Sequence, residues 1–315
     1  MGKNKKRYLP LLPERPLSVP IIDNHTHIGA DPAPASGGEL QQRYDPEGRI
    51  LMPVLERTLL ARMADAGVRG AITSGCEIPE FAHTLELAKR VPNIWAAIAI
   101  HPNEAAMHAG ISAASPDGLT HEFAVHHREF SLDDAIAQVA QIAQEPEVVA
   151  VGETGLDYFR TGEAGKAAQK ESFRAHLQLA KELGKPMQIH DRDAHADVVE
   201  ILQRDGAPEK TVFHCFSGDV KLAEICAENG WYASFAGPIT YPVNTQLQHA
   251  FDSLPDELIL IETDAPYLTP VPYRGHPNAV WGCVYTAGFM AQQRGYPLEK
   301  WCEILNRNTF AVYGI

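Results

Sequence analysis

The 315-residue sequence predicts an α/β fold in which eight strand–helix units close into one TIM-type (β/α)8 barrel. Short apolar, β-branched runs alternate with amphipathic helical patterns along the chain, and such alternation indicates a parallel sheet. No change of composition marks a second domain, and an uninterrupted series of eight units favours closure. Ionisable residues follow several strands, and a barrel brings such strand ends together. The alternative is an open, doubly wound sheet.

The expected strands are short segments rich in β-branched and aromatic residues. They span residues 19–23, 70–74, 94–100, 148–152, 186–189, 211–213, 231–235 and 258–262. Helical periodicity of the apolar residues appears between and after them. These patterns lie near residues 52–66, 79–90, 131–145, 164–184, 193–205, 219–229, 244–254 and 280–294.

Three segments fall outside this pattern. Residues 31–50 and 103–130 are expected to be long loops that follow strands, where barrel loops frame the active site. The basic, proline-containing residues 1–18 are expected to form an exposed arm before a barrel domain of residues 19–315.

Charge and cysteine content narrow the classes of function. The formal net charge of −13 repels nucleic acid, so a nucleic-acid substrate would need a local positive site, which bound metal ions could supply. The five cysteines form no CxxC pair, which argues against a disulfide framework and favours the cytoplasm. No apolar run reaches 18 residues, so we expect no membrane span.

Two histidines, His25 and His27, follow the first apolar strand. Residues i and i+2 of a strand share a face, so both imidazoles can reach one point at the barrel mouth. Neutral imidazoles are good ligands for divalent transition ions. Taken alone, the pair is explained equally well by two hydrogen-bonded surface histidines.

The pattern recurs at four further strand ends, which strengthens the case for a metal centre. An ionisable residue at the end of a buried strand is costly unless it is paired or ligated. Six such residues in register predict a ligand set. The set is His25, His27, Glu153, His190, His214 and Asp264.

The number of ligands predicts two divalent ions, because a typical open catalytic zinc site has only three protein ligands. We expect Glu153 to bridge two ions ~3.5–4 Å apart. One ion would be completed by His25, His27 and Asp264, and the other by His190 and His214. Glu262 is expected to be an outer partner of a ligand or a barrel-interior residue rather than a ligand itself. Zinc, manganese, magnesium, cobalt and nickel all remain open.

Six segments carry a more specific signal, and in combination they resemble the TatD family of metal-dependent hydrolases in the amidohydrolase-like superfamily. They are Asp23-Asn-His-Thr-His27, Ala99-Ile-His-Pro102, Gly152-Glu-Thr-Gly-Leu-Asp157, His190-Asp-Arg192, His214-Cys-Phe-Ser-Gly218 and Glu262-Thr-Asp-Ala-Pro-Tyr-Leu268. The resemblance implies a TIM barrel, divalent metals and phosphodiester hydrolysis, often as a deoxyribonuclease. The order His276-Pro-Asn278 departs from the family's pattern after Arg274-Gly, and the two long loops look like insertions.

The leading hypothesis is therefore a hydrolase that cleaves phosphodiesters of nucleic acid or a smaller substrate with a two-metal-activated water. Asp264 would be the catalytic general base, and the resemblance suggests that His101 faces the substrate. Arg192 and Arg274 are predicted phosphate clamps, because guanidinium groups match phosphate oxygens. An amide or lactone hydrolase and a non-catalytic barrel scaffold remain as alternatives.

Several nearby residues have simpler interpretations. Cys215 follows His214 and is expected to pack on the opposite side of the strand. The histidines of the second long loop, at positions 108, 121, 126 and 127, are expected to be solvated. Trp231, Tyr232 and Phe235 are expected to pack within the fold rather than to stack on bases.

Overall fold

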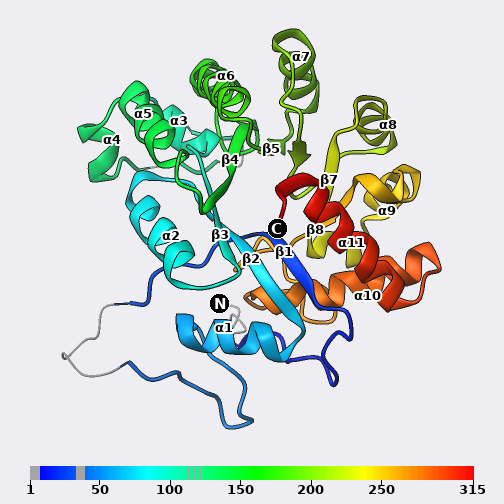
Figure 1. The fold of residues 1–315 in the computed structure, drawn as a ribbon. Helices are drawn as coiled ribbons and strands as arrows, with labels where there is room; N and C mark the ends of the chain where they lie inside the picture. Colours follow the sequence, from blue (N-terminus) through cyan, green and yellow to red (C-terminus); the bar gives the residue numbers. More distant parts are fainter. Residues whose placement is uncertain (1–7, 33–39, 113, 117, 121) are drawn as a thin grey trace.

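The computed structural model describes residues 8–32, 40–112, 114–116, 118–120 and 122–315. Eight parallel strands pair in chain order from β1 to β8, and the helices surround them (Figure 1). A doubly wound sheet would reverse its strand order at a switch point. The sequential order confirms the predicted TIM-type barrel.

All eight expected strands are present, most with bounds shifted by a few residues. They are β1 (Ile21–Thr26), β2 (Val68–Gly75), β3 (Ile94–Ile98), β4 (Val148–Asp157), β5 (Met187–Arg192), β6 (Thr211–Phe213), β7 (Tyr232–Phe235) and β8 (Ile259–Ile261). β4 and β5 run past the expected ends because residues 154–157 continue the ladder with residues 189–192.

All eight expected helices are present, and α3, α4 and α11 are additional. The described α-helices are α1 (Glu56–Asp65), α2 (Ile78–Arg90), α3 (Pro102–His108), α4 (Val125–Glu129), α5 (Leu132–Ile142), α6 (Lys166–Leu183), α7 (His195–Asp205), α8 (Val220–Asn229), α9 (Thr245–Ser253), α10 (Cys283–Arg294) and α11 (Leu298–Tyr313). No helix in the described part of the chain is long and apolar enough to cross a membrane.

The junction between the last and first strands is closed by hydrogen bonds on the side of the future site. The amide of Asp264 donates to the carbonyl of His25 at 3.0 Å, and Asn24 Nδ2 donates to the carbonyl of Ile261 at 2.8 Å. These bonds fix the segment after β8 against β1, so the residues that follow both strands face one another.

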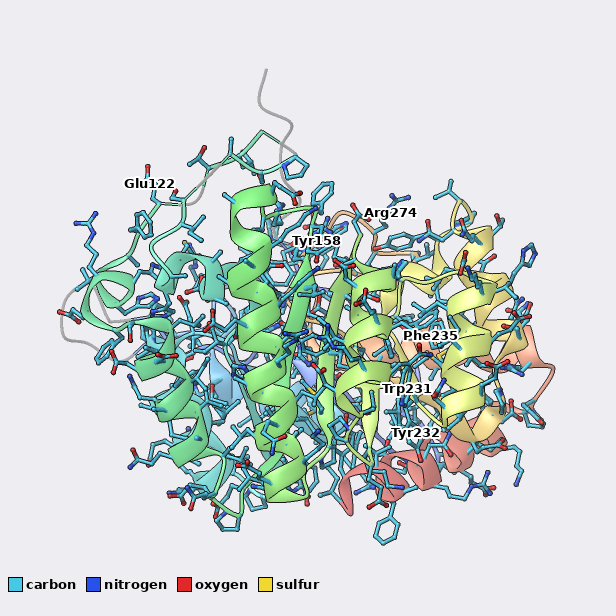
Figure 2. The ribbon with its side chains drawn as sticks, turned by 90° about the horizontal axis from the view of Figure 1, so that it is seen from above. Glu122, Tyr158, Trp231, Tyr232, Phe235 and Arg274 are labelled. Carbon is cyan, nitrogen blue, oxygen red and sulfur yellow. The ribbon has the colours of Figure 1, made fainter. Side chains whose placement is uncertain are left out.

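The aromatic residues of the β7 region lie in the core, as expected. Phe235 is fully buried, and Trp231 and Tyr232 are nearly so. Figure 2 places Trp231 and Tyr232 towards one end of the barrel, and Tyr158 and Arg274 at the other, where the strands end. The carboxyl ends of the strands therefore lie at the opposite end of the barrel from Trp231 and Tyr232.

The second long segment contains structure that the sequence interpretation lacked. Residues 103–130 include most of α3 and all of α4. The expectation of solvated histidines is wrong for His108, His126 and His127, which are only 5%, 9% and 8% exposed. They turn inward around one carboxylate. His121 lies outside the described residues.

The segment before the barrel also packs against it. From Tyr8 onward, Leu9 is 1% exposed and its amide donates to the carbonyl of Ile50. The indole of Trp281 donates to the carbonyl of Pro10 at 3.0 Å. In the described part of the expected arm, Leu9, Pro10 and Leu17 are thus buried, whereas residues 14–16 are exposed.

Candidate metal centre

One group of four side chains surrounds a point between β1, β4 and the segment after β8. His25 Nε2 and His27 Nε2 lie 3.4 Å apart. Glu153 Oε1 lies 3.7 and 3.5 Å from these nitrogens, and Asp264 Oδ1 lies 3.8 and 3.4 Å from them. Around an ion with ligand distances near ~2.1 Å, tetrahedral ligands are about 3.4 Å apart. The spacing therefore fits one small divalent ion.

The second oxygen of Glu153 faces a second group. Glu153 Oε2 lies 2.7 Å from His214 Nε2 and 2.9 Å from His190 Nδ1. Oε1 of Glu153 thus faces His25 and His27, and Oε2 faces His190 and His214. A ligand that bridges two ions requires this arrangement. The structure brings together all six residues predicted as ligands.

Hydrogen bonds behind the ligands set their tautomers. Gln188 Nε2 donates to the carbonyl of Asn24 and to the Tyr313 hydroxyl, so Gln188 Oε1 accepts from His25 Nδ1 at 2.9 Å. The proton of His25 is therefore on Nδ1, and the Nε2 lone pair faces the centre. Such outer partners hold a ring in the orientation that ligation requires.

Glu262 does the same for His214, which is one of the two roles that the sequence left open for it. Glu262 Oε1 accepts from His214 Nδ1 at 3.0 Å and from the amide of Cys215 at 2.8 Å. A carboxylate behind an imidazole raises its basicity and fixes its tautomer. Glu262 thus holds the predicted ligand His214 from behind.

Three residues of the centre were absent from the sequence prediction. Asp157 Oδ2 lies 3.2 Å from His190 Nε2, and Cys76 Sγ lies 3.5 Å from Glu153 Oε1. Gln188 is the third. Asp157 ends the quoted segment Gly152–Asp157, and that position was the available signal. Cys76 and Gln188 offered none, because a lone cysteine and a neutral amide are common in barrel interiors.

Charge coupling keeps the carboxylates ionised. Burial alone would raise the pKa of Glu153, but the neighbouring His214 and His190 imidazoles hold it well below its ordinary value. Burial would lower the pKa of His190, but hydrogen bonds to Asp157 and Glu153 raise it to about 9. Without an ion, His190 holds an extra proton at neutral pH, and an incoming ion must displace it.

The donor set fits divalent ions on its own chemistry. Buried imidazole lone pairs and carboxylate charges at this spacing repel one another unless protons or a cation lie between them, and leaving them unpaired would be costly. His25, His27, Glu153 and Asp264 would hold one ion, and Glu153, His190 and His214 the other. Imidazole with carboxylate suits zinc, manganese, cobalt or nickel, and carboxylate also admits magnesium.

Comparison with known proteins identifies the family. The family profile described as TatD related DNase matches residues 22–314. This chain belongs to the TatD family. It is 34% identical over 263 residues to the uncharacterized metal-dependent hydrolase TatD of Mycobacterium tuberculosis, covering 82% of this chain and 91% of that protein. The protein is thus a metal-dependent hydrolase.

Two further TatD-family relatives bear on the site. The 3'-5' ssDNA/RNA exonuclease TatD of Salmonella typhimurium is 33% identical over 215 residues, covering 67% of this chain and 73% of that protein. The crystal structure of YJJV, a TatD homologue from Escherichia coli K12, matches with a TM-score of 0.73 and 28% identity. It covers 94% of this chain and 98% of that chain.

The centre opens into a cavity of about 570 Å³ that is lined by all of the predicted ligands except His25, by Asp157 and by several residues of the mouth. Arg192 and His101 are among them. Arg274 is not among the described lining residues; its guanidinium lies 4.3 Å from the centre of the Tyr241 ring. The two predicted phosphate clamps therefore occupy different places.

His101 lines the cavity and also caps a helix. Its Nδ1 accepts from the amide of Asn103 at 3.1 Å and caps α3, while the ring packs against His190 with centroids 4.5 Å apart. Burial, reinforced by His190, lowers its pKa to about 4. At neutral pH His101 is therefore an uncharged group that lines the cavity.

Cys215 does not face away from the cavity as expected. β6 ends at Phe213, so the alternation of a strand no longer applies, and Cys215 adopts a left-handed φ of 42° and lines the cavity. Asp264 has a similar φ of 54°. Left-handed backbone in these residue types costs about 1–3 kcal/mol and gathers at functional sites.

Proposed function

We propose that the protein hydrolyses phosphodiester bonds of single-stranded nucleic acid, as a TatD-like deoxyribonuclease. The observation that carries this is the content of one cavity, where the ligand set lies beside a guanidinium and an exposed aromatic ring. Arg192 supplies the guanidinium and Tyr267, which is 62% exposed, supplies the ring. The name of the Salmonella typhimurium relative supports the same substrate class.

Arg192 is suited to hold a phosphate. Its guanidinium lies 4.0 Å from the centre of the Phe159 ring, which orients the group while leaving it exposed at the mouth. A planar guanidinium can donate two parallel hydrogen bonds to phosphate oxygens. It would therefore position the backbone of the substrate above the ligands.

Tyr267 is suited to stack on a base. It follows Asp264 by three residues on the segment after β8, and the rim position leaves its ring open to solvent. Bases stack on aromatic side chains with little dependence on sequence, and each stack contributes about 1–3 kcal/mol. A duplex hides these base faces, so a single strand fits the cavity better.

Asp264 is the proposed general base. Burial would raise its pKa, but the hydrogen bond to His27 and the charge of His214 lower it, so the carboxylate is ionised at neutral pH. Asp264 would take the proton of the attacking water, and the neutral His101 would line the path of the leaving group. Divalent ions at this centre supply Lewis acidity and offset the substrate's negative charge.

The net charge of −13 makes the local positive charge of the ions and Arg192 necessary for binding a polyanion. All five cysteines are free thiols, which supports the further proposal of a reducing, cytoplasmic setting.

The test compares substrates on the purified protein with added manganese or magnesium. Single-stranded DNA and RNA labelled at either end, a duplex, a generic phosphodiester and a lactone are assayed in parallel, with Asp264→Asn as the inactive control. We expect metal-dependent cleavage of single strands, and the fragment pattern identifies exonuclease or endonuclease action. Turnover of the lactone without any phosphodiester cleavage would overturn the proposal in favour of the amide and lactone class.

A further inference from the structure

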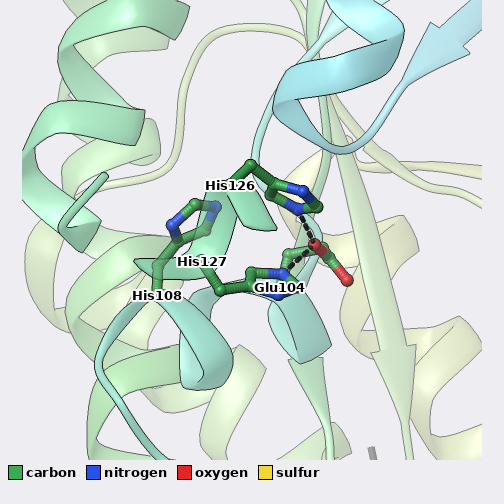
Figure 3. A group of neighbouring side chains, drawn as sticks. All are labelled: Glu104, His108, His126 and His127. Atoms are coloured by element: carbon green, nitrogen blue, oxygen red, sulfur yellow. Dashed lines mark hydrogen bonds and ion pairs between the residues drawn. The ribbon is translucent and has the colours of Figure 1, made fainter. Parts of the chain in front are cut away.

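A second group of ligand-type side chains lies outside the barrel mouth, in the segment 103–130. Glu104 and His108 come from α3, and His126 and His127 from α4 (Figure 3). One ligand atom of each lies within 4.8 Å of those of the other three. Tetrahedral zinc ligands are about 3.4 Å apart, so small side-chain rotations would bring these atoms to binding distance.

His108 has a lone pair with no use within the protein. Its Nδ1 lies 2.8 Å from the carbonyl of Phe130, and a carbonyl only accepts, so Nδ1 carries the proton. The Nε2 lone pair is buried and has no hydrogen-bond partner among the residues that the structure describes. A buried, unsatisfied acceptor costs about 1–3 kcal/mol. The His108 ring lies beside those of His126 and His127, with centroids 5.5 and 4.9 Å away.

His126 brings two carboxylates to the same place. Its Nε2 lies 3.2 Å from Glu104 Oε2 and 3.5 Å from Glu77 Oε2. A cation at this point would relieve the repulsion between the two carboxylates.

His127 is placed to support the site. The amide of Ala124 donates to its Nδ1 at 2.9 Å, so its Nε2 carries the proton and donates to Glu104 Oε2 at 2.7 Å. An imidazole that donates to a ligating carboxylate orients it, as outer partners of metal sites do. The metal-binding set is then His108, His126 and Glu104, with His127 holding Glu104.

We propose that His108, His126 and Glu104 bind a divalent transition ion of the zinc class, separate from the ions of the barrel centre. Two imidazoles and one carboxylate make an N/O set typical of zinc, and three protein ligands leave a position for water. The ion would tie α3 to α4.

The position of Glu104 connects this site to the cavity. Its neighbour Asn103 lines the cavity, and Asn103 Nδ2 donates to Asp157 Oδ2 at 3.4 Å. The first turn of α3 therefore faces the barrel centre with one residue and the second site with the next. An ion on Glu104 would hold this turn in place.

The direct test is X-ray diffraction at the zinc absorption edge on crystals of the wild-type protein soaked in Zn²⁺. We expect an anomalous peak between His108, His126 and Glu104, in addition to any peaks at the barrel centre. Absence of a peak there, with the barrel centre loaded, would overturn the proposal and leave a purely hydrogen-bonded cluster.

Solution measurements test the same site without relying on activity. The variants are the double substitution His108→Gln with His126→Gln, and the isosteric Glu104→Gln. The matched control is His249→Gln, at an exposed position of α9. After chelation and reloading with Zn²⁺, we expect the double variant and Glu104→Gln to bind one equivalent fewer than wild type, and the control to bind the same amount. Equal Zn²⁺ content in a folded Glu104→Gln protein and wild type would contradict the assignment.

Proteolysis measures the effect on the segment between the helices. Chymotrypsin can cleave after Leu119, which is exposed, and after Phe123. At free Zn²⁺ about ten times the dissociation constant, opening of the segment should be suppressed about tenfold in wild type. Glu104→Gln should lose this protection and His249→Gln should keep it. Protection in wild type equal to that in Glu104→Gln would contradict the proposed tie between α3 and α4.

Discussion

Replacing Asp264 with Asn tests the proposed base with little change of shape. Asn keeps Oδ1, which in Asp264 lies 3.4 Å from His27 Nε2 and 3.8 Å from His25 Nε2. It also tolerates the left-handed φ of 54° about as well as Asp, whereas Ala would add backbone strain. The substitution therefore removes one negative charge and the proton acceptor, while the position of the chain is retained.

The expected loss follows from the role of the lost group. A positioned general base contributes about 10²–10⁴-fold, which corresponds to about 2.7–5.4 kcal/mol of transition-state stabilisation. Asn remains a weaker oxygen ligand, so at saturating manganese the metal content should stay near that of wild type. The loss should then appear in kcat rather than in KM, because Arg192 and Tyr267 still bind the substrate.

The assay measures kcat and KM on a labelled single-stranded oligonucleotide, with metal content and thermal unfolding determined on the same samples. Asp197→Asn is the matched control, since it removes the same charge from α7, where Asp197 pairs with Lys170. A metal-loaded Asp264→Asn protein that retains more than about a tenth of wild-type kcat would refute the role of Asp264 as base.

Three further predictions probe the bridge, the substrate and the fold. Glu153→Gln should lose at least one bound metal equivalent, measured by mass spectrometry of the metals, because its two oxygens face different histidine pairs. Arg192→Ala should raise KM for a phosphodiester but not for a lactone, and Arg274→Ala should have the smaller effect because that residue is exposed outside the described cavity lining. Burial lowers the pKa of His176 to about 4 from its ordinary 6.5. The neutral imidazole therefore contributes fully to stability above pH 6.5, by at most about 3 kcal/mol. This contribution is lost as the pH falls towards 4. Urea unfolding between pH 4.5 and 7 should show a shallower loss for His176→Gln.

The barrel was predictable because its strands are set by local patterns. Runs such as Val148–Val151 leave little alternative to a buried strand, and the next helix follows within a short loop. The helix α11 was not predicted, although Trp301, Leu305 and Val312 are buried along one side of it. The eight expected strand–helix units already ended at α10. A further helix could be inferred only from its packing against the barrel, which the sequence does not show.

The clustering of the six predicted ligands could be foreseen for a geometric reason, and the positions of their hydrogen-bond partners could not. A histidine or acid directly after an apolar strand is visible in one dimension, because parallel barrel strands end on the same face. Gln188 and Cys76 lie among other barrel residues, and nothing in their residue type separates a tautomer-setting amide or a nearby thiol from ordinary packing. Their roles depend on which strand lies next to which, as with Gln188 of β5 reaching His25 of β1.

The cluster in the segment 103–130 shows the limit of reasoning from strand ends. Its proposed ligands lie on two short helices. The sequence separation of His108 and His126 does not indicate that they are neighbours, because only the packing of α3 against α4 brings them together. Residues one apart on a helix differ by about 100° in direction, so Asn103 and Glu104 serve two different neighbourhoods from a single turn. His101 caps that turn and packs against His190. The segment that looked like an insertion in the sequence is therefore attached directly to the catalytic face, and an ion bound to Glu104 would act on the mouth through α3.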